Sequence, residues 1–384
     1  MSKILSLSTL ILAGLTGAAS ALESDLPPPE SIKSLMTRVC DWQLENVTDT
    51  VINRSEVGDK SEKVSDLGWI RGAFYVGVIA QFQVSKDARY LDVVRKWGEK
   101  NGWQLGPRLR HADDQTVAQV YADLHFIDPD ANLLRAAKSN FDLMIADPHR
   151  GPDRGWSKDH NWSWCDALFM APPAMARVAR ASGEPKYLDL LNTLWWDTHA
   201  YLYDQEEHLF YRDANFMAAP GQAQPLSPGG KKIFWGRGNA WVLAGLARTL
   251  EYLPEDLPDR PRYIKLFREM STTIAACQGG DGLWRSSLTE PSWHPAPESS
   301  CSAMFCYALA YGINAGHLPE GTFRPVVVRA WNGLRTCVED TGQLGWVQPT
   351  GHDPQPVYRH ETLEYGTGAF LLAGRELIRM RQKK

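Results

Sequence analysis

A short motif occurs six times along this chain of 384 residues. Each copy starts with a tryptophan, a glycine or a charged residue, continues with small residues and leads into an apolar stretch. The copies are Trp69–Ala73, His111–Gln115, Trp164–Ala167, Trp235–Trp241, Glu298–Ser302 and Glu364–Gly368. A motif that returns at such intervals is typical of stacked helical hairpins, because one hairpin cannot bury its apolar face alone. The repeat therefore restricts the chain to an arrangement of packed helices.

Two kinds of helix are expected to alternate along the chain. The segments that follow the motif, such as Ala303–Ala310, are apolar nearly all round, which predicts burial on every side. The segments between the motifs have apolar residues at three- and four-residue spacing with charges between them, as amphipathic surface helices do. These are Ile32–Glu45, Ala88–Asn101, Ala131–Ala146, Lys186–His199, Arg262–Ala275 and Phe323–Glu339.

The simplest closed arrangement of twelve such helices is an all-α (α/α)6 barrel, with six inner helices surrounded by six outer ones. An open superhelix is the alternative, although its repeats are usually shorter and more regular. The insert over residues 201–232 is rich in Gly, Pro and Asp, and within it Leu209–Asp213 is expected to form a short strand or a loop. We expect little strand otherwise, and one catalytic domain over residues 22–384, since no linker interrupts the chain.

The N-terminus has the pattern of a signal peptide. Lys3 precedes an apolar run from Ile4 to about Ala19, and Ala19-Ser20-Ala21 resembles a cleavage site, so residues 1–21 are expected to be removed. The run is too short for a membrane-spanning helix, which needs about 20 apolar residues. The mature protein is therefore expected to be exported, to a periplasm or to the outside, with no membrane partner.

Composition excludes several other classes of function. The net charge of −4 does not suggest a nucleic-acid partner. The six cysteines are scattered, so buried free thiols are favoured, although an exported protein leaves one or two disulfides open. No zinc signature, phosphate loop, dinucleotide fingerprint or serine-nucleophile elbow is present, so we expect neither a metal nor a cofactor. The chain is expected to act as a monomer or a small homo-oligomer.

Inner helices that run parallel place all six motifs at one end of the ring, which we call the rim. Helix N-termini present unpaired N–H groups and a partial positive charge, and both favour anions. Arginines and tryptophans beside carboxylates suit an acidic carbohydrate. The residues expected at the rim are Arg71, His111, Asp113, Asp114, Asp166, Arg237, Glu298 and Glu364, with Trp69, Trp162, Trp164, Trp235 and Trp241.

Asp166 is the clearest candidate for a catalytic acid. It opens an apolar helix and follows Trp162 and Trp164. A carboxyl group confined against indoles has its charged form disfavoured, and the raised pKa is what a general acid needs near neutral pH. Aspartate is also a preferred N-cap, and the spacing alone supports both roles equally.

The other charged residues of the motifs leave similar alternatives. One of Asp113 and Asp114 is expected to cap a helix while the other reaches the site, and the sequence does not choose between them. Glu298 and Glu364 are expected to cap helices or to accept hydrogen bonds. Arg237 stands at a helix start, where the macrodipole favours acids, so its partner is expected to be a bound carboxylate or an Asp side chain. Trp241 lies four residues on, hence on the same helix face.

Several of these segments resemble glycoside hydrolase family 105, the unsaturated rhamnogalacturonyl hydrolases, which are akin to the family 88 unsaturated glucuronyl hydrolases. The similar segments are Trp164–Met170, Phe234–Trp241, Asp281–Arg285, Glu298–Ser300 and Tyr365–Phe370. The resemblance implies an (α/α)6 barrel and a substrate with a 4,5-unsaturated uronic acid at its non-reducing end. It further implies that Asp166 protonates C4 of the enol ether and helps to deliver water to C5. A second family Asp maps to Asp113 or Asp114, and Arg237 and Trp241 match substrate contacts.

One departure from the family bears on the substrate. Some members carry a pocket histidine where this chain continues as Arg212-Asp213, which leaves rhamnogalacturonan, ulvan and other lyase products as sources. Arg212 is therefore expected to contact the sugar carboxylate or the neighbouring sugar. Four residues of the rim are also expected to bind the substrate: Trp69, His111, Trp164 and Trp235. The rival functions are a polysaccharide lyase or an inverting glycosidase on the same barrel, and a non-catalytic oligosaccharide-binding protein.

Overall fold

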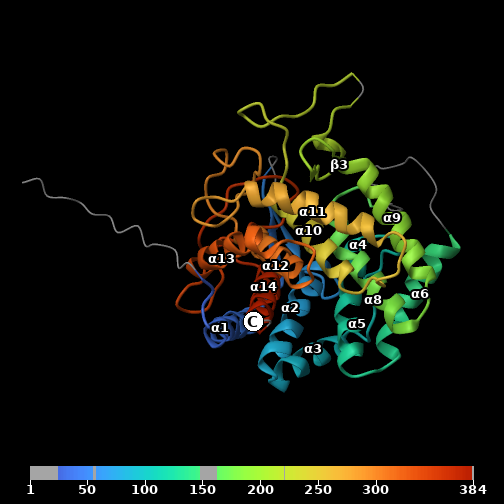
Figure 1. The fold of residues 1–384 in the computed structure, drawn as a ribbon. Coiled ribbons are helices and arrows are strands. Elements are labelled where there is room, and N and C mark those ends of the chain that lie inside the picture. Colours follow the sequence, from blue (N-terminus) through green and yellow to red (C-terminus); the bar gives the residue numbers. More distant parts are fainter. Residues whose placement is uncertain (1–24, 55–57, 148–161, 220, 383–384) are drawn as a thin grey trace, which may run out of the picture.

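The computed structural model describes residues 25–54, 58–147, 162–219 and 221–382, so the expected signal peptide lies outside the described residues. Helices dominate the fold (Figure 1). The outer helices are α1 (Pro29–Glu45), α3 (Ala88–Lys100), α6 (Asn132–Ala146), α9 (Lys186–Leu202), α11 (Arg260–Ala276) and α13 (Glu320–Thr336). The inner helices are α2 (Trp69–Ser85), α4 (Ala112–Gln115) with α5 (Val117–Ile127), α7 (Ala167–Met170) with α8 (Pro172–Ser182), α10 (Gly236–Leu250), α12 (Ser299–Asn314) and α14 (Glu364–Gln382).

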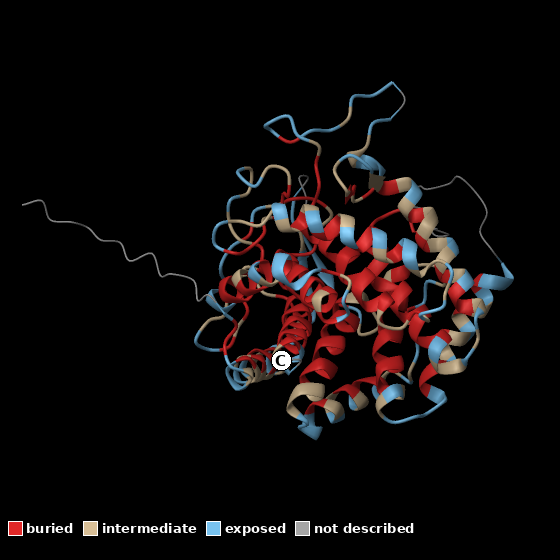
Figure 2. Ribbon diagram, in the orientation of Figure 1, coloured by how far each residue is buried: buried red, intermediate tan, exposed pale blue. Residues whose placement is uncertain are grey.

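The inner helices form a closed ring. Following the chain, α2 packs on α5, α5 on α8, α8 on α10, α10 on α12, α12 on α14, and α14 returns to α2. Figure 2 shows the inner helices buried along their length, whereas the outer helices carry exposed stripes. The predicted (α/α)6 barrel is therefore confirmed, and the two helix types follow from the two hydrophobic patterns.

Two of the six inner helices are divided, which the sequence analysis did not predict. The break between α7 and α8 falls at Ala171, directly before Pro172 and Pro173. Prolines lack the N–H that would continue the helix, and they are tolerated at the first positions of a new one. The break between α4 and α5 falls at Thr116, whose N–H bonds to the Asp113 carbonyl three residues back. Both breaks lie within a few residues of the rim.

The described strands form two short antiparallel hairpins. Strands β1 (Thr50–Asn53) and β2 (Lys60–Lys63) pair with Val51 opposite Glu62. Strands β3 (Tyr203–Asp204) and β4 (Leu209–Phe210) pair with Tyr203 opposite Phe210. The second hairpin contains the predicted strand at Leu209, and the chain continues from it to the rim. The first hairpin was not predicted, because its second strand is exposed throughout and shows no apolar alternation.

All six cysteines lie in the described part of the chain, and all six are free, as favoured from the sequence. A search of the described residues for a helix long and apolar enough to cross a bilayer returned no candidate.

Candidate active site

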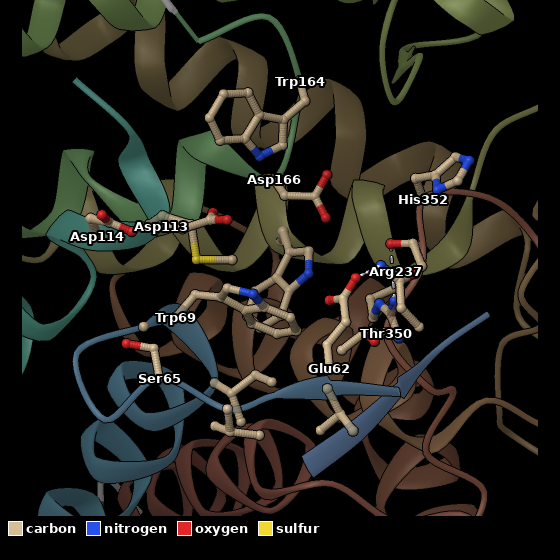
Figure 3. A pocket seen from close by; sticks show the side chains of 18 of the residues that line it. Glu62, Ser65, Trp69, Asp113, Asp114, Trp164, Asp166, Arg237, Thr350 and His352 are labelled. Carbon is tan, nitrogen blue, oxygen red and sulfur yellow. Dashed lines mark hydrogen bonds between the residues drawn. The ribbon is translucent and has the colours of Figure 1, made fainter. Parts of the chain in front are cut away.

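A cavity of about 620 Å³ opens at the rim, where the inner helices begin. Of the residues predicted to act in catalysis or to contact the sugar, His111 and Trp235 do not line it, and the following eight do: Trp69, Asp113, Asp114, Trp164, Asp166, Arg212, Arg237 and Trp241. They come from four different inner helices or their entry loops and from the loop after β4, so the closed ring brings distant motifs together. Figure 3 shows the side chains of Asp113 and Asp166 in the upper part of the view, with that of Trp69 below them.

Asp166 occupies the N-cap position of α7, but its side chain makes no capping hydrogen bond. The side chain lines the cavity instead and is about 10% exposed. Burial raises the pKa of Asp166, and the positive charges of Arg212 and Arg237 partly oppose that rise. The nearer cation is Arg212, whose Nε lies 3.4 Å from Oδ2 of Asp166. Of the two roles left open by the sequence, the geometry therefore favours the acid over the cap.

Asp113 is the second carboxyl group of the cavity. Its side chain is 20% exposed and lines the cavity. Burial raises the pKa of Asp113 to about 7; Arg108 opposes the rise, and the charges of Asp166 and Asp114 add to it. Asp113 and Asp166 therefore line the same cavity, and the charge of Asp166 favours the protonated form of Asp113.

Asp114 is committed to a structural ion pair. Its Oδ1 lies 2.6 Å from Arg108 Nη2, and its Oδ2 accepts from the Arg108 backbone N–H at 2.8 Å and from Nε at 3.1 Å. These bonds fold the loop before α4 against the helix start. Asp114 still borders the cavity, but its oxygens are occupied, so Asp113 is the better placed of the pair to act on a ligand.

Arg237 projects from the first turn of α10 and is almost fully buried. Its Nη1 donates to the backbone carbonyls of Gln348 at 2.6 Å and Pro349 at 2.8 Å, and also to the Tyr365 hydroxyl. Within the described residues no carboxylate pairs with Arg237, so the Arg–Asp alternative is wrong. A buried cation held only by neutral oxygens favours an anionic ligand.

Aromatic side chains form part of the cavity wall. Trp69 and Trp241 meet edge to face with ring centroids 5.9 Å apart, and both contact the Tyr365 ring behind them. Trp164 lines another part of the wall and packs on His111 with centroids 4.7 Å apart. Such indole faces can stack on a flat sugar ring.

Two predicted contact residues stand behind the wall. Trp235 is buried beneath the Arg237 guanidinium, 4.4 Å from it, and donates through Nε1 to Gln348. His111 supports Trp164, with Nδ1 3.7 Å from the Asp113 carboxylate. Neither side chain lines the cavity, so direct contact of His111 or Trp235 with the sugar stays a prediction. A helix-start motif indicates which residues reach the rim but not which rotamer faces inward.

The remaining motif residues are structural. Glu298 caps α12 by accepting from the N–H groups of Ser300 and Cys301, as expected. Glu364 accepts from Arg71 Nη1 at 2.6 Å, and this pair is buried outside the cavity lining. The expectation that Arg71 would serve as a cation of the site is therefore wrong.

Several lining residues were missed by the sequence analysis. The hairpin β1–β2 contributes Asn53, Glu62 and Lys63, and a loop contributes Thr350–His352. Hairpin and loop are joined, because Arg54 N–H donates to the Thr350 carbonyl at 2.8 Å. Neither segment carries a motif. Of the missed lining residues, only Arg108 could have been found from the sequence, because it lies three residues before the motif that starts at His111.

A metal site is not indicated in the described part of the chain, where no group of three or more His, Cys, Asp or Glu side chains has suitable geometry. The site consists of two carboxyl groups, arginines and indoles in a closed helical ring. Together they define a carbohydrate-active enzyme for an acidic sugar.

The comparisons with known proteins agree with this class. The family model of Glycosyl Hydrolase Family 88 matches residues 35–381, so the chain belongs to this family. An unsaturated 3S-rhamnoglycuronyl hydrolase from Formosa agariphila is 38% identical over 320 residues, covering 82% of this chain and 85% of the relative. A protein of the same name from Alteromonas sp. strain LOR is 32% identical over 369 residues, 91% of this chain and 87% of the relative.

A solved structure described as a polysaccharide lyase has the same fold. It superposes with a TM-score of 0.79 at 29% identity, covering 93% of this chain and 99% of its own. The resemblance to the family 88 and 105 unsaturated uronyl hydrolases is confirmed by the family match and by the curated relatives.

Proposed function

We propose that this enzyme removes a 4,5-unsaturated uronic acid from the non-reducing end of lyase-generated oligosaccharides by hydrating the enol-ether double bond. The observation that carries the proposal is Asp166, a buried carboxyl group of raised pKa that lines the cavity and makes no capping bond. Protonation of an enol ether needs one such acid, whereas a retaining glycosidase needs a paired nucleophile.

The reaction balances without any cofactor. Asp166 gives its proton to C4, the double bond is lost, and positive charge develops at C5 and the ring oxygen. Water adds to C5 and returns a proton to the carboxylate, so Asp166 acts first as acid and then as base. The resulting C5 hemiketal opens to a ketone and leaves an open-chain hemiacetal at C1. This hemiacetal collapses to an aldehyde and expels the shortened saccharide as an alcohol, so the hydrated sugar leaves as an open-chain keto product.

The other lining residues have complementary roles in this proposal. Asp113 is favoured in its protonated form, because burial and the charge of Asp166 both disfavour its ionisation. Arg237 attracts the uronate carboxylate, and the indoles of Trp69, Trp164 and Trp241 stack on the planar unsaturated ring. Arg108 and the β1–β2 hairpin border the space that remains for the leaving sugar.

The names of the curated relatives narrow the substrate class. Both are unsaturated 3S-rhamnoglycuronyl hydrolases. Of the sources considered from the sequence, this favours an unsaturated uronate attached to rhamnose, as in ulvan- or rhamnogalacturonan-type products. A screen of lyase-generated oligosaccharides with different leaving sugars tests the choice, and the highest kcat/KM should belong to a rhamnose-linked substrate.

A polysaccharide lyase is the second candidate, because a solved structure of that description shares the fold at 29% identity. Ultraviolet absorbance separates the two activities. Hydration destroys the conjugated double bond, so absorbance falls, whereas a lyase creates that double bond and absorbance rises. We expect a fall with unsaturated oligosaccharides and no rise with the intact polysaccharide. A rise would replace the proposal by the lyase.

The variant Asp166→Asn tests the acid directly. We expect kcat to fall by at least about 100-fold, because a general acid contributes about 100- to 10,000-fold. Substrate binding, measured by calorimetry, should persist. Asp189→Asn on the exposed face of α9 is the matched control and should keep full activity. Near-normal kcat in Asp166→Asn would remove Asp166 from its role, and binding without turnover in the parent enzyme would favour a non-catalytic binding protein.

We also propose that the protein is exported. The support is the charged, apolar and small-residue order of residues 1–21. Mass spectrometry of the protein from its native host should find a mature N-terminus near Leu22, and an intact Met1 in most molecules would contradict export by cleavage.

A further inference from the structure

Arg212 is joined to the segment of Asp166 by both backbone and side chain. The Arg212 carbonyl accepts a hydrogen bond from the Cys165 N–H at 2.8 Å, which ties the loop after β4 to the start of α7. Its Nε lies 3.4 Å from Oδ2 of Asp166. Only about 11% of the Arg212 side chain is exposed. The arginine is therefore fixed relative to the carboxyl group that the proposed reaction uses.

The side chain of Asp213 holds Arg212 in place. Asp213 Oδ2 accepts from Arg212 Nη1 at 2.6 Å, and its Oδ1 accepts from the Asn215 N–H at 2.8 Å. Asp213 is buried and does not line the cavity. Charge-assisted bonds of this length between buried groups hold a guanidinium in one orientation. Asp213 thus acts on Arg212 without access to a ligand.

The contacts of Asp166 are asymmetric. Arg212 approaches Oδ2, and the Cys165 thiol also points to Oδ2 at 3.7 Å. Both of these side-chain contacts go to Oδ2 and neither goes to Oδ1, while the carboxyl group as a whole lines the cavity. An arrangement that engages one oxygen and leaves the other available orients a carboxyl group for directional proton transfer.

We propose that Arg212, held by Asp213, is a positioning residue that fixes the Asp166 carboxyl group with Oδ1 toward the substrate. This inference rests on the proposed function of Asp166. It assigns Arg212 a role in orienting the acid, beyond contact with the sugar, and it assigns Asp213 a role from outside the cavity.

The charges around Asp166 give the pH dependence its sign. Arg212 and Arg237 are the cations that oppose the rise in the pKa of Asp166, the Cys165 thiol bonds to it, and Asp113 is the neighbouring carboxyl group. Removing the charge of Arg212 raises the pKa of Asp166 further. If protonated Asp166 is the acid, the alkaline limb of kcat then moves to higher pH.

Three single variants and one double variant test the inference. Arg212→Gln should lower kcat by about 10- to 100-fold with KM changed by less than about 3-fold, because a misplaced acid affects the chemical step. In this variant the alkaline limb of the pH profile of kcat should move to higher pH. Arg212→Lys should return that limb toward the parent position, since it keeps the charge. Asp213→Asn should lower kcat in the same direction, and the double variant Arg212→Gln/Asp213→Asn should lose less than the product of the single losses.

Arg324→Gln is the matched control. Arg324 lies on α13, is 16% exposed and pairs with Asp25 and with Glu320. It does not line the cavity, so its substitution should leave kcat and the alkaline limb of kcat unchanged. A rise in KM alone for Arg212→Gln, with kcat and the limb unmoved, would make Arg212 a sugar contact only.

A readout without substrate separates this inference from the proposed function. Infrared difference spectra between the parent and Asp166→Asn report the titration of the Asp166 carboxyl group, and we expect the same titration to move upward in the Arg212→Gln background. If the parent enzyme consumes no unsaturated uronate, the proposed function is overturned. The infrared spectrum would still report whether Arg212 shifts the titration of the Asp166 carboxyl group. An unmoved titration would overturn the positioning role.

Discussion

Asp113 and Asp114 are neighbours in sequence with opposite surroundings. Arg108 lies six positions before Asp114 and takes both of its oxygens. Asp113, one residue earlier on a helical turn, points into the cavity beside Asp166 (Figure 3). The difference follows from the helical rotation of about 100° per residue, which cannot place adjacent side chains in the same direction.

The raised pKa of Asp113 has a measurable effect on stability. Burial raises its pKa to about 7, against 3.8 for an ordinary aspartate. Between these values the folded protein holds a proton that the unfolded chain releases, so the free energy of unfolding falls as pH rises from about 4 to about 7. Asparagine removes this dependence. We expect Asp113→Asn to equal the parent near pH 4 and to exceed it above pH 7 by on the order of 1–4 kcal/mol.

Urea unfolding followed by tryptophan fluorescence at about pH 4 and about pH 8 checks this expectation. Asp114→Asn is the comparison, because it leaves Arg108 without its charged partner; it should be less stable than the parent at about pH 8 by roughly 1–3 kcal/mol. Equal pH dependence in Asp113→Asn and the parent would show that Asp113 is ionised in the folded protein.

At the scale of elements, glycines set how closely the inner helices approach. A Cβ at Gly368 on α14 would lie 2.2 Å from the Ala73 carbonyl oxygen on α2, and one at Gly77 would lie 2.5 Å from the Gly368 Cα. A Cβ at Gly245 on α10 would lie 2.2 Å from the Leu168 carbonyl oxygen on α7. These contacts are with backbone, so no change of rotamer can relieve them. The spacing of the ring therefore depends on these positions.

Gly368→Ala should destabilise the protein by about 1–3 kcal/mol or more, because the added methyl group forces α2 and α14 apart. Gly321→Ala on α13 is the matched control. Its Cβ would meet no atom within 4 Å, so the better helix propensity of alanine should stabilise the protein by up to about 1 kcal/mol. Thermal unfolding of both variants measures the difference. Equal stability of Gly368→Ala and the parent would mean that the two helices separate without cost.

Across the whole molecule, the two ends of the barrel differ. The cavity occupies the rim, whereas a buried ionic cluster lies toward the C-terminal ends of the inner helices. Asp123 of α5 accepts from Arg177 of α8 at 2.6 Å and from Arg248 of α10 at 2.9 Å. Glu251 adds a second carboxylate 3.3 Å from Arg177. The cluster joins three helices of the ring and satisfies charges that burial would otherwise make costly.

Breaking this cluster should affect stability and not catalysis. Burial tends to raise the pKa of Asp123, but Arg177 and Arg248 outweigh it and hold the pKa below its ordinary value. Its stabilisation is therefore present above about pH 4 and is lost as the pH falls further. We expect Asp123→Asn to lose about 3–5 kcal/mol at neutral pH, since the buried Arg177 and Arg248 both lose the Asp123 charge and Arg177 keeps only Glu251. Urea unfolding measures the loss, and kcat of the folded enzyme should be unchanged; a fall in kcat without loss of stability would contradict this separation.

The sequence by itself determined the two helix types, their alternation and the gathering of the motifs at one end. The helix types are readable because the period of the hydrophobic residues is a local property of the sequence. The motifs gather because parallel inner helices in a closed ring have all their N-termini at the same end. The tertiary structure alone decided which side chains enter the cavity. Arg237 is held by the Gln348 carbonyl 111 positions away, and the unpredicted hairpin β1–β2 completes the wall. Such contacts depend on how distant segments pack against one another, so local sequence patterns do not predict them.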